Sequence, residues 1–251
     1  TGAEAFLHRL GIRRARSLPV FLESLKIAHQ FGQLSSNRIA SISCSGGEAA
    51  LAADTAQDTE LVFPPLNPRQ VKDLSAALGP MVALANPLDY HTYIWRDQAA
   101  MTQAWAAMAD DDIAMTLLIS DYPRADLCDA SDWACVTQAA IAATRRTGRP
   151  YAVVASLAEL LPEHIAKTLI DNGVGAIHGL DHGLQALDLM SRPMAPLAEP
   201  VLLPGRDRDT AVLDEHSAKL ALATHGLNIP KSVVVTDRAA AELAAAEIGF
   251  P

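Results

Sequence analysis

A short stretch from Ser43 to Glu48, Ser-Cys-Ser-Gly-Gly-Glu, combines small polar residues and bare glycines in a way that suits anion binding. The residues before it, Arg38 to Cys44, are typical of a buried strand, and those after it, Glu48 to Gln57, are typical of a helix. Two glycines leave the first amide groups of that helix without side-chain cover, and those amides together with the helix dipole attract negative charge. The sequence therefore predicts a phosphate or carboxylate site at Ser45, Gly46, Gly47 and Glu48.

The same stretch allows two plainer interpretations and excludes a third. A Gly-Gly pair between a strand and a helix is also the ordinary tight turn of α/β proteins. Cys44, near a helix N-terminus, is either a thiol of lowered pKa or, more commonly, a buried cysteine at a strand end. A hydrolase nucleophile elbow is excluded, because it needs a glycine two residues before its serine, and Ser43 stands two residues before Ser45.

The densest cluster of functional side chains is Asn86-Pro87-Leu88-Asp89-Tyr90-His91-Thr92-Tyr93-Ile94-Trp95. Pro87 favours an extended Asn86, so the side chains of Asn86 and Asp89 either fold back on the loop or reach a cleft. His91 is a candidate acid, base or ligand, and Trp95 is a candidate substrate contact. Asp89 and His91 form a conceivable metal pair, but no third ligand follows at a recognisable spacing, so we predict no metal site. A purely structural, hydrogen-bonded loop is the alternative.

Two further polar clusters follow apolar runs. Asp121 comes directly after the run 114–120 and can hold either a neighbouring loop or a substrate hydroxyl. Arg124 is a candidate for contact with an anionic substrate, although an ion pair with Asp126 or Asp129 on the surface is the simpler expectation. The last cluster, which we expect mainly to cap and solvate a helix start, contains His178, Asp181 and His182.

Short apolar runs alternate with longer amphipathic stretches from Arg38 onward. The predicted strands are Arg38 to Cys44, Glu60 to Phe63, Met81 to Leu84, Ala114 to Ser120, Tyr151 to Ala155 and Gly175 to His178. The predicted helices are Glu48 to Gln57, Pro68 to Leu78, Asp97 to Ala109, Ser131 to Thr147, Leu161 to Asn172 and Leu180 to Ser191. This alternation predicts an α/β fold with a parallel sheet and helices on both faces, whose ligands collect beyond the carboxyl ends of the strands.

The segments on either side differ from this pattern. Before it, the sequence predicts a helix from Gly2 to Leu10, a short strand from Ile12 to Ala15 and a second helix capped by Ser17, which together suggest the tail of a preceding domain. After it, the proline-rich stretch 193–204 predicts a linker. Beyond that linker, helices are predicted at Asp214 to His225 and Arg238 to Ile248, with a short apolar run at Ser232 to Val235; the chain then stops where another strand is expected, which suggests a truncated domain.

Composition and charge narrow the class of protein. With 251 residues and 50% hydrophobic content, the chain is long enough for a substantial core, and no apolar run approaches the ~20 residues of a membrane span. Three cysteines without a CxxC pair argue against a disulfide framework and suit a reducing cytoplasm. A net charge of -9 makes nucleic acid an improbable partner. We therefore expect a soluble cytoplasmic protein that binds neither membranes nor nucleic acid.

Two of these motifs together resemble the NDP-forming acyl-CoA synthetases, relatives of succinyl-CoA synthetase. In that family a strand ends in a Gly-Gly turn, its helix runs into an aspartate, and Asn-Pro-x-Asp follows downstream. Here the corresponding residues are Gly46-Gly47, Asp54 and Asn86-Pro87-Leu88-Asp89. Acetate-type members usually carry Thr-Asn-x-Gly-Gly instead, so this chain looks closer to the branch that includes feruloyl-CoA and dimethylsulfoniopropionate-CoA ligases.

The resemblance implies a division of the chain into parts of several domains. Residues 1–36 look like the C-terminal end of a CoA-ligase domain, residues 37–192 like a flavodoxin-like CoA-ligase domain, residues 193–204 like a linker, and residues 205–251 like the start of a truncated ATP-grasp domain. The last piece is similar through 214–219, His225-Gly226-Leu227-Asn228-Ile229-Pro230 and 245–251. We accordingly expect a flavodoxin-like sheet flanked by fragments of neighbouring domains.

The resemblance also implies a reaction. In this family ATP phosphorylates a mobile histidine, the phosphate passes to a carboxylic acid, and CoA attacks the acyl phosphate to give acyl-CoA, ADP and phosphate. The helix that starts at Gly46-Gly47 matches one of the two helices that aim their N-termini at the phosphohistidine. That histidine, and most of the site for ATP, CoA and Mg²⁺, would lie outside this chain, so the chain alone is expected to be inactive. A homo-oligomer formed through neighbouring domains is also implied.

Two other classes of function stay open at this point. One is a catalytically degenerate relative, such as the ligase-like part of a protein acyltransferase. The other is a small-molecule binding module that uses the same cleft without catalysis. A His-Thr-Gly or His-Ala-Gly loop shortly before Thr1 would favour the ligase, and an acid-labile, base-stable phosphoenzyme is expected of the ligase alone.

Overall fold

The computed structural model describes residues 2–193, 195–196 and 212–249, and the chain divides into two compact units, Thr1–Val201 and Leu202–Pro251. Most of the predicted linker 193–204, and residues 205–211 and 250–251 of the predicted C-terminal piece, lie outside the described residues. Each unit is considered by itself below.

The first unit is built on a five-stranded parallel sheet with the order β2-β1-β3-β4-β5. The strands are β1 (Ile39–Ser43), β2 (Leu88–Asp89), β3 (Met115–Ile119), β4 (Tyr151–Ala155) and β5 (Gly175–His178). Every neighbouring pair is parallel, and β1 sits between β2 and β3 with Ile42 opposite both Leu88 and Leu118. The strand order reverses between β1 and β3, which makes this the position where ligands of flavodoxin-like sheets bind. The predicted α/β class and parallel sheet are confirmed.

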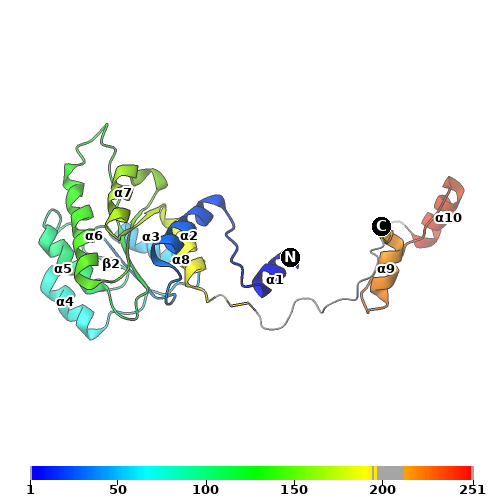
Figure 1. The fold of residues 1–251 in the computed structure, drawn as a ribbon, viewed down its shortest axis with the longest axis horizontal. Coiled ribbons are helices and arrows are strands. Elements are labelled where there is room, and N and C mark those ends of the chain that lie inside the picture. Colours follow the sequence, from blue (N-terminus) through cyan, green and yellow to red (C-terminus); the bar gives the residue numbers. More distant parts are fainter. Residues whose placement is uncertain (1, 194, 197–211, 250–251) are drawn as a thin grey trace. The chain divides into compact units, whose positions relative to one another are not determined.

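Helices cover both faces of the sheet (Figure 1). One face is covered by α4 (Pro68–Leu78), α5 (Gln98–Met108), α6 (Ala134–Thr147) and α7 (Glu163–Asp171). The other face is covered by α2 (Leu18–Phe31), α3 (Gly46–Ala56) and α8 (Leu180–Ser191), with the short α1 (Gly2–Arg9) preceding α2. Alternate strand residues serve the two hydrophobic cores: Ile42 and Val153 face the first, whereas Ile39 and Val154 face the second.

Three predicted strands are wrong. The run 60–63 contributes a single bridge, between Val62 and Arg38, and neither 81–84 nor 12–15 forms a strand. Instead the edge strand β2 lies a few residues later, inside the polar cluster, where Leu88 is fully buried. Met81 is 73% exposed, so this apolar residue does not belong to the core. A two-residue edge strand is too short to produce a periodic signal.

A partly buried charge cluster, which the sequence analysis did not predict, joins α2 to the sheet. Ser17 caps α2 as predicted, by accepting a hydrogen bond from the amide of Val20. Further along α2, the Lys26 ammonium lies 2.7 Å from Glu23 Oε2 and donates to the carbonyl of Ala176 at 2.8 Å. It also lies 2.9 Å from His178 Nδ1, and burial followed by this ammonium lowers the pKa of His178. Lys26 therefore ties α2 to β5.

Removing the ammonium should destabilise the first unit strongly. Lys26→Met would leave the Glu23 carboxylate, 8% exposed, without its cation, and we expect a loss of about 2–3 kcal/mol in the free energy of unfolding. Lys72→Met, on the exposed side of α4, is the matched control and should change stability by less than ~0.5 kcal/mol. Urea titrations of both variants measure the loss in the free energy of unfolding. Equal losses in the two variants would show that Lys26 makes no specific contribution to stability. Adding Glu23→Gln to Lys26→Met should recover part of the loss.

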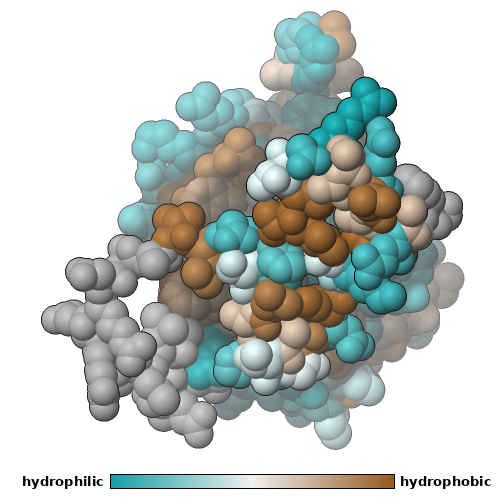
Figure 2. Space-filling view, turned by 90° about the vertical axis from the view of Figure 1, so that its right-hand side faces the viewer, coloured by the Kyte–Doolittle hydropathy of each residue, from teal (hydrophilic) through white to brown (hydrophobic). Residues whose placement is uncertain are grey.

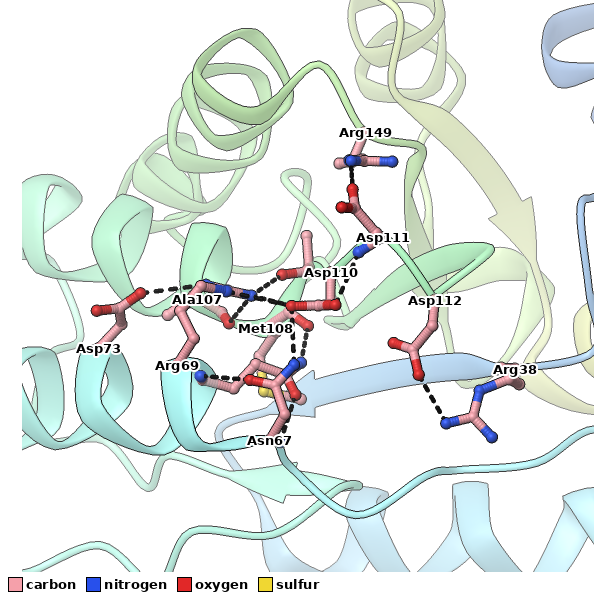
Figure 3. A network of polar contacts seen from close by, with 12 residues as sticks. Arg38, Asn67, Arg69, Asp73, Ala107, Met108, Asp110, Asp111, Asp112 and Arg149 are labelled. Carbon is pink, nitrogen blue, oxygen red and sulfur yellow. Dashed lines mark hydrogen bonds and ion pairs between the residues drawn. The ribbon is translucent and has the colours of Figure 1, made fainter.

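Three successive aspartates, Asp110 to Asp112, lie in the loop before β3, at the amino ends of the strands (Figure 3). Each pairs with a different arginine: Asp110 with Arg69, Asp111 with Arg149 and Asp112 with Arg38. Asp110 also accepts a hydrogen bond from Asn67, the N-cap of α4. Burial opposes ionisation of Asp110, but the hydrogen bonds from Asn67 and Arg69 outweigh it and lower its pKa. The acidic run is therefore a structural clamp.

The second unit contains α9 (Glu215–Ala223) and α10 (Arg238–Ile248). Asp214 and Asp237 cap these helices by accepting hydrogen bonds from the amides of Ser217 and Ala240. The predicted helices 214–225 and 238–248 are thus present, but 232–235 forms no strand. Neither helix buries a side chain, so their hydrophobic residues add to those that Figure 2 shows at the protein surface. Among the described residues, no helix is long and apolar enough to cross a membrane.

Candidate functional site

Three loops meet at the carboxyl ends of β1, β2 and β3. The first runs from Ser43 into α3, the second follows Asp89, and the third follows Ile119. Because these strands are neighbours and all parallel, the loops leave the sheet at the same edge. The predicted site residues of the first two loops and Asp121 are thereby brought to one region.

The N-terminus of α3 emerges directly from β1. Ser45 is the N-cap residue, but its side chain makes no capping hydrogen bond. Ser43 instead donates from its buried Oγ to the carbonyl of Ser45 at 3.0 Å, which fixes the turn. Gly46 and Gly47 are both exposed, and their backbone angles are helical, without the left-handed conformation that only glycine tolerates easily. The glycines thus matter for the space they leave above the amides, not for a sharp turn.

Asp89 lies beside this turn. A Cβ atom added to Gly46 would lie 3.1 Å from Asp89 Oδ2, so any side chain there would press on the carboxylate. The other carboxylate oxygen of Asp89 accepts a hydrogen bond of 2.7 Å from the His91 amide, and His91 Nδ1 is 3.3 Å from Oδ2. The His91 ring is about half exposed and packs at 5.4 Å from the Tyr93 ring. Asp89 therefore connects the His91 loop to the start of α3.

Asn86 folds back onto the sheet. Its Oδ1 accepts a hydrogen bond from the amide of Ser41 at 3.1 Å, and its Nδ2 donates to the carbonyls of Ile39 and Pro64 at 3.0 and 3.1 Å. These bonds satisfy backbone groups on the edge of β1 that a longer β2 would otherwise pair. Of the two alternatives that the sequence left for Asn86, the structure shows the first, in which the side chain positions the loop that carries Asp89.

A pocket of about 340 Å³ opens beside α3. It is lined by Cys44, Glu48, Thr92, Trp95, Ser120, Asp121 and Trp133. Trp95 and Trp133 form an edge-to-face pair with ring centroids 5.3 Å apart and planes at 73°. Trp133 comes from the short helix η1 (Ser131–Trp133). A pocket that combines aromatic side chains with polar ones is typical of a small-molecule site.

Glu48 is the unusual ionisable group of this pocket. Burial first, and then the nearby charges of Asp121 and Asp89, raise the pKa of Glu48 to about 7. Its Oε2 atom is inaccessible to solvent and has no hydrogen-bond partner. A carboxyl group with these properties exchanges a proton near neutral pH, as expected of a residue at a functional site.

The shifted pKa of Glu48 should appear in the pH dependence of stability. The unfolded chain releases this proton near 4.5 and the folded chain near 7, so the stabilising contribution is complete below pH 4.5 and lost as pH rises to about 7. Glu48→Gln should therefore raise the free energy of unfolding at pH 8 by about 1 kcal/mol, allowing for solvent screening at a partly exposed group, and leave it unchanged at pH 4. Glu163→Gln, in the exposed first turn of α7, is the control. If the stability of the two variants depended on pH in the same way, the raised pKa of Glu48 would be contradicted.

Of the remaining predicted residues, Asp121 lines the pocket and Arg124 does not. Asp121 accepts hydrogen bonds from the amide (2.7 Å) and the hydroxyl of Ser156, so it both lines the pocket and holds the loop after β4. Arg124 pairs with Asp126 on an exposed loop, in agreement with the simpler expectation, and does not line the pocket. Burial and Glu48 raise the pKa of Cys44, so the alternative of an activated thiol is wrong.

The structure also adds residues that sequence reasoning did not assign to the site. Thr92, Ser120 and Trp133 line the pocket beside the predicted Trp95 and Asp121. Thr92 lay inside the polar cluster, but Ser120 and Trp133 belong to other loops, and only the strand order brings them together. Within the described part of the chain, no group of three or more His, Cys, Asp and Glu residues is arranged to hold a metal ion.

Comparison with known proteins connects this chain to CoA ligases. No family model matches it. A trans-feruloyl-CoA synthase from an unknown prokaryotic organism is 24% identical over 250 residues, which are 98% of this chain and 35% of that protein. The chain thus spans about a third of the length of this curated relative.

Solved structures share the fold of three quarters of this chain at low sequence identity. The crystal structure of PH0766 from Pyrococcus horikoshii OT3 gives a TM-score of 0.64 at 18% identity over 75% of this chain and 42% of that one. The dinucleotide forming acetyl-coenzyme A synthetase 1 of Ca. Korarchaeum cryptofilum, solved with phosphate and ADP, gives 0.60 at 15% identity over 75% of this chain and 39% of that one. The resemblance to NDP-forming acyl-CoA synthetases that the motifs indicated is confirmed, and the fold is the one found in these structures.

Proposed function

We propose that this chain is part of an acid–CoA ligase that makes acyl-CoA from a carboxylic acid, CoA and ATP, and releases ADP and phosphate. The likeness to a feruloyl-CoA synthase and to an acetyl-CoA synthetase solved with ADP and phosphate supports this reaction class. The observation that carries the proposal is the uncapped, glycine-faced N-terminus of α3 at the carboxyl end of β1, next to the pocket.

In this proposal the start of α3 receives a phosphorylated histidine from a loop outside the chain. The amides of Gly46, Gly47 and Glu48 and the positive end of the α3 dipole stabilise the phosphoryl charge, as preorganised donors stabilise other oxyanions. Asp89, whose Oδ2 lies beside Gly46, accepts a hydrogen bond from the second ring nitrogen of that histidine and so orients it. Asn86 and His91 hold the loop in place through their contacts with β1 and Asp89.

The rest of the reaction depends on neighbouring parts. We assign residues 1–36 to the end of a preceding CoA-ligase domain, 37–192 to a ligase domain and 205–251 to the start of an ATP-grasp domain, with a linker at 193–204. Apolar side chains exposed on α9 and α10 support the last assignment, because they fit a unit that packs against further structure: Leu220, Leu222, Leu243 and Ile248. ATP, Mg²⁺ and CoA are then held mainly outside this chain, in a cytoplasmic homo-oligomer.

The proposal is tested by phosphorylation of the complete natural polypeptide. Incubation with γ-labelled ATP should produce an acid-labile, base-stable phosphoenzyme, and adding a carboxylic acid with CoA should discharge the label with formation of acyl-CoA. A polypeptide that takes up no label would contradict the ligase and favour a degenerate relative or a binding module. Label that is never discharged, over a panel of carboxylic acids, would contradict the acyl-transfer half of the proposal.

A further inference from the structure

The carboxyl group of Glu48 has no part in phosphoryl transfer as proposed above, where only the backbone amide of this residue takes part. Glu48 is the third residue of α3, a position from which glutamate often folds back onto the amide of the N-cap residue. Here the side chain lines the pocket instead, and no described residue donates a hydrogen bond to it. Glu48 therefore belongs to the start of α3 through its amide and to the pocket through its carboxyl group.

No other side chain of the pocket lining, as the structure describes it, is available to accept a proton at neutral pH. Asp121 is engaged, because its two carboxylate oxygens accept hydrogen bonds from the amide and the hydroxyl of Ser156. Burial and the charge of Glu48 raise the pKa of Cys44, so this thiol stays protonated. The lining contains no lysine, arginine or histidine. Glu48 is therefore the base that this pocket offers to a ligand.

The proposed reaction needs a proton acceptor at the step that forms the thioester. A thiol has an ordinary pKa of about 8.5, so it is mostly protonated at pH 7, and the thiolate is the nucleophile. If the amides at the start of α3 hold the phosphate of an acyl phosphate, the thiol must come within about 3.5 Å of the adjoining acyl carbon. The raised pKa of Glu48, about 7, makes its carboxylate a better match for a thiol proton than an ordinary glutamate.

We propose that the thiol end of CoA enters this pocket and that Glu48 accepts its proton during attack on the acyl phosphate. The inference rests on the proposed function, since it assigns a residue to one step of that reaction. Glu48 takes the proton as the S–H bond breaks, while a bond forms between sulfur and the acyl carbon and the bond from that carbon to the phosphate oxygen breaks. Glu48 then gives the proton to the departing phosphate, which leaves as hydrogen phosphate, and the carboxylate is restored.

Binding of the thiol end alone tests whether it enters the pocket. The probe is pantetheine, which carries the thiol of CoA without the nucleotide, and S-methylpantetheine is the matched ligand without a thiol proton. In NMR spectra of the labelled chain under reducing conditions, pantetheine should shift the carboxyl signal of Glu48 and the indole signals of Trp95 and Trp133. S-methylpantetheine should bind about 3–10-fold more weakly, the loss expected for one hydrogen bond. Signals that do not move, or equal affinity for the two probes, would overturn the proposal.

Kinetics of the complete natural polypeptide test the proton transfer. Glu48→Gln keeps the backbone amide, so it should form the phosphoenzyme at the normal rate, but it should slow thioester formation at pH 7 by about 10²–10⁴-fold. The acyl phosphate should then accumulate, and added hydroxylamine should trap it as a hydroxamate. At pH 9 the thiol ionises without help, so the deficit should shrink to less than about 10-fold. Glu163→Gln, the same change in the exposed first turn of α7, is the control and should leave both rates unchanged.

The ionisable groups that face Glu48 are the same in wild type and in Glu48→Gln. They come from the ends of three neighbouring strands and the residues that follow them: Cys44, Asp89, Tyr90 and Asp121. The ratio of the two rates at each pH therefore reports on Glu48 itself. Unimpaired thioester formation in Glu48→Gln at pH 7 would overturn the proposal. An equal deficit at pH 7 and pH 9 would also overturn it, because it would show that the side chain only shapes the pocket.

Failure of this inference is distinguishable from failure of the ligase proposal. A polypeptide that forms no phosphoenzyme would refute the ligase and, with it, the role of Glu48 in thioester formation. A phosphoenzyme that a carboxylic acid and CoA discharge at the same rate in wild type and Glu48→Gln would support the ligase and refute the role of Glu48 alone.

Discussion

Gly46→Val should reduce phosphoryl transfer in the complete polypeptide by about 10²–10³-fold, the loss typical when a preorganised oxyanion site is removed. A Cβ at this position would already lie 3.1 Å from Asp89 Oδ2, and the two methyl groups of valine would cover the amides at the start of α3. The fold should survive, because Gly46 is exposed and its backbone is helical. We expect the melting temperature to change by less than ~4 °C, equivalent to about 1 kcal/mol for a unit of this size.

Ala50→Val is the matched control for this variant, because Ala50 is an exposed residue of α3 that takes no part in the proposed anion site. Single-turnover phosphorylation from ATP, measured for both variants beside circular dichroism melts, separates the effects. Normal phosphorylation of Gly46→Val would remove the assignment of this turn. A collapse of its melting temperature would show instead that the glycine serves packing.

Asp89→Asn should lower phosphoryl transfer by about 10–100-fold with little change in stability. Asparagine retains an oxygen that can accept the 2.7 Å hydrogen bond from the His91 amide, so the loop should keep its shape. It loses the negative charge beside Gly46 that would orient the incoming imidazole. Asp89→Ala removes both the charge and the hydrogen bond, and should cost a further ~1 kcal/mol of stability.

The pair of Asp89 variants distinguishes chemistry from structure. If Asp89 acts on the histidine, both variants lose activity to a similar extent, and only Asp89→Ala loses stability. A structural role would give the reverse pattern, with nearly normal transfer per folded molecule in Asp89→Asn and a large fall in the melting temperature of Asp89→Ala. The readouts are initial phosphorylation rates and thermal melts of the same preparations.

Much of the fold was predictable because its elements are long and regular. Four elements were predicted with the bounds that the structure shows: Tyr151–Ala155, Gly175–His178, Pro68–Leu78 and Leu180–Ser191. The sheet edge was not predictable, because β2 has two residues and lies inside a polar loop. There the side chain of Asn86 makes hydrogen bonds with the β1 backbone that a neighbouring strand would otherwise make. Neither secondary-structure propensity nor hydrophobic periodicity predicts such a side-chain contact.

The site divides in the same way. Two glycines after an apolar run predict a helix N-terminus from the sequence alone. Asp89, Trp95 and Asp121 could be expected near that N-terminus, because each of them lies at or after the end of a strand. The contribution of Trp133 could not, since it depends on which loops become neighbours at the sheet edge. The shifted pKa of Glu48 also depends on distances to Asp121 and Asp89 that spacing along the chain does not determine.

The most direct test of the account is whether phosphate binds to the amides at the start of α3. Titration of the ¹⁵N-labelled chain with inorganic phosphate, followed by ¹H–¹⁵N NMR, reports each amide separately. The account predicts saturable downfield shifts at Gly46, Gly47 and Glu48 that are lost in Gly46→Val, with no such shifts at the start of α7. Shifts spread evenly over all helix N-termini, or absent from Gly46 to Glu48, would contradict it.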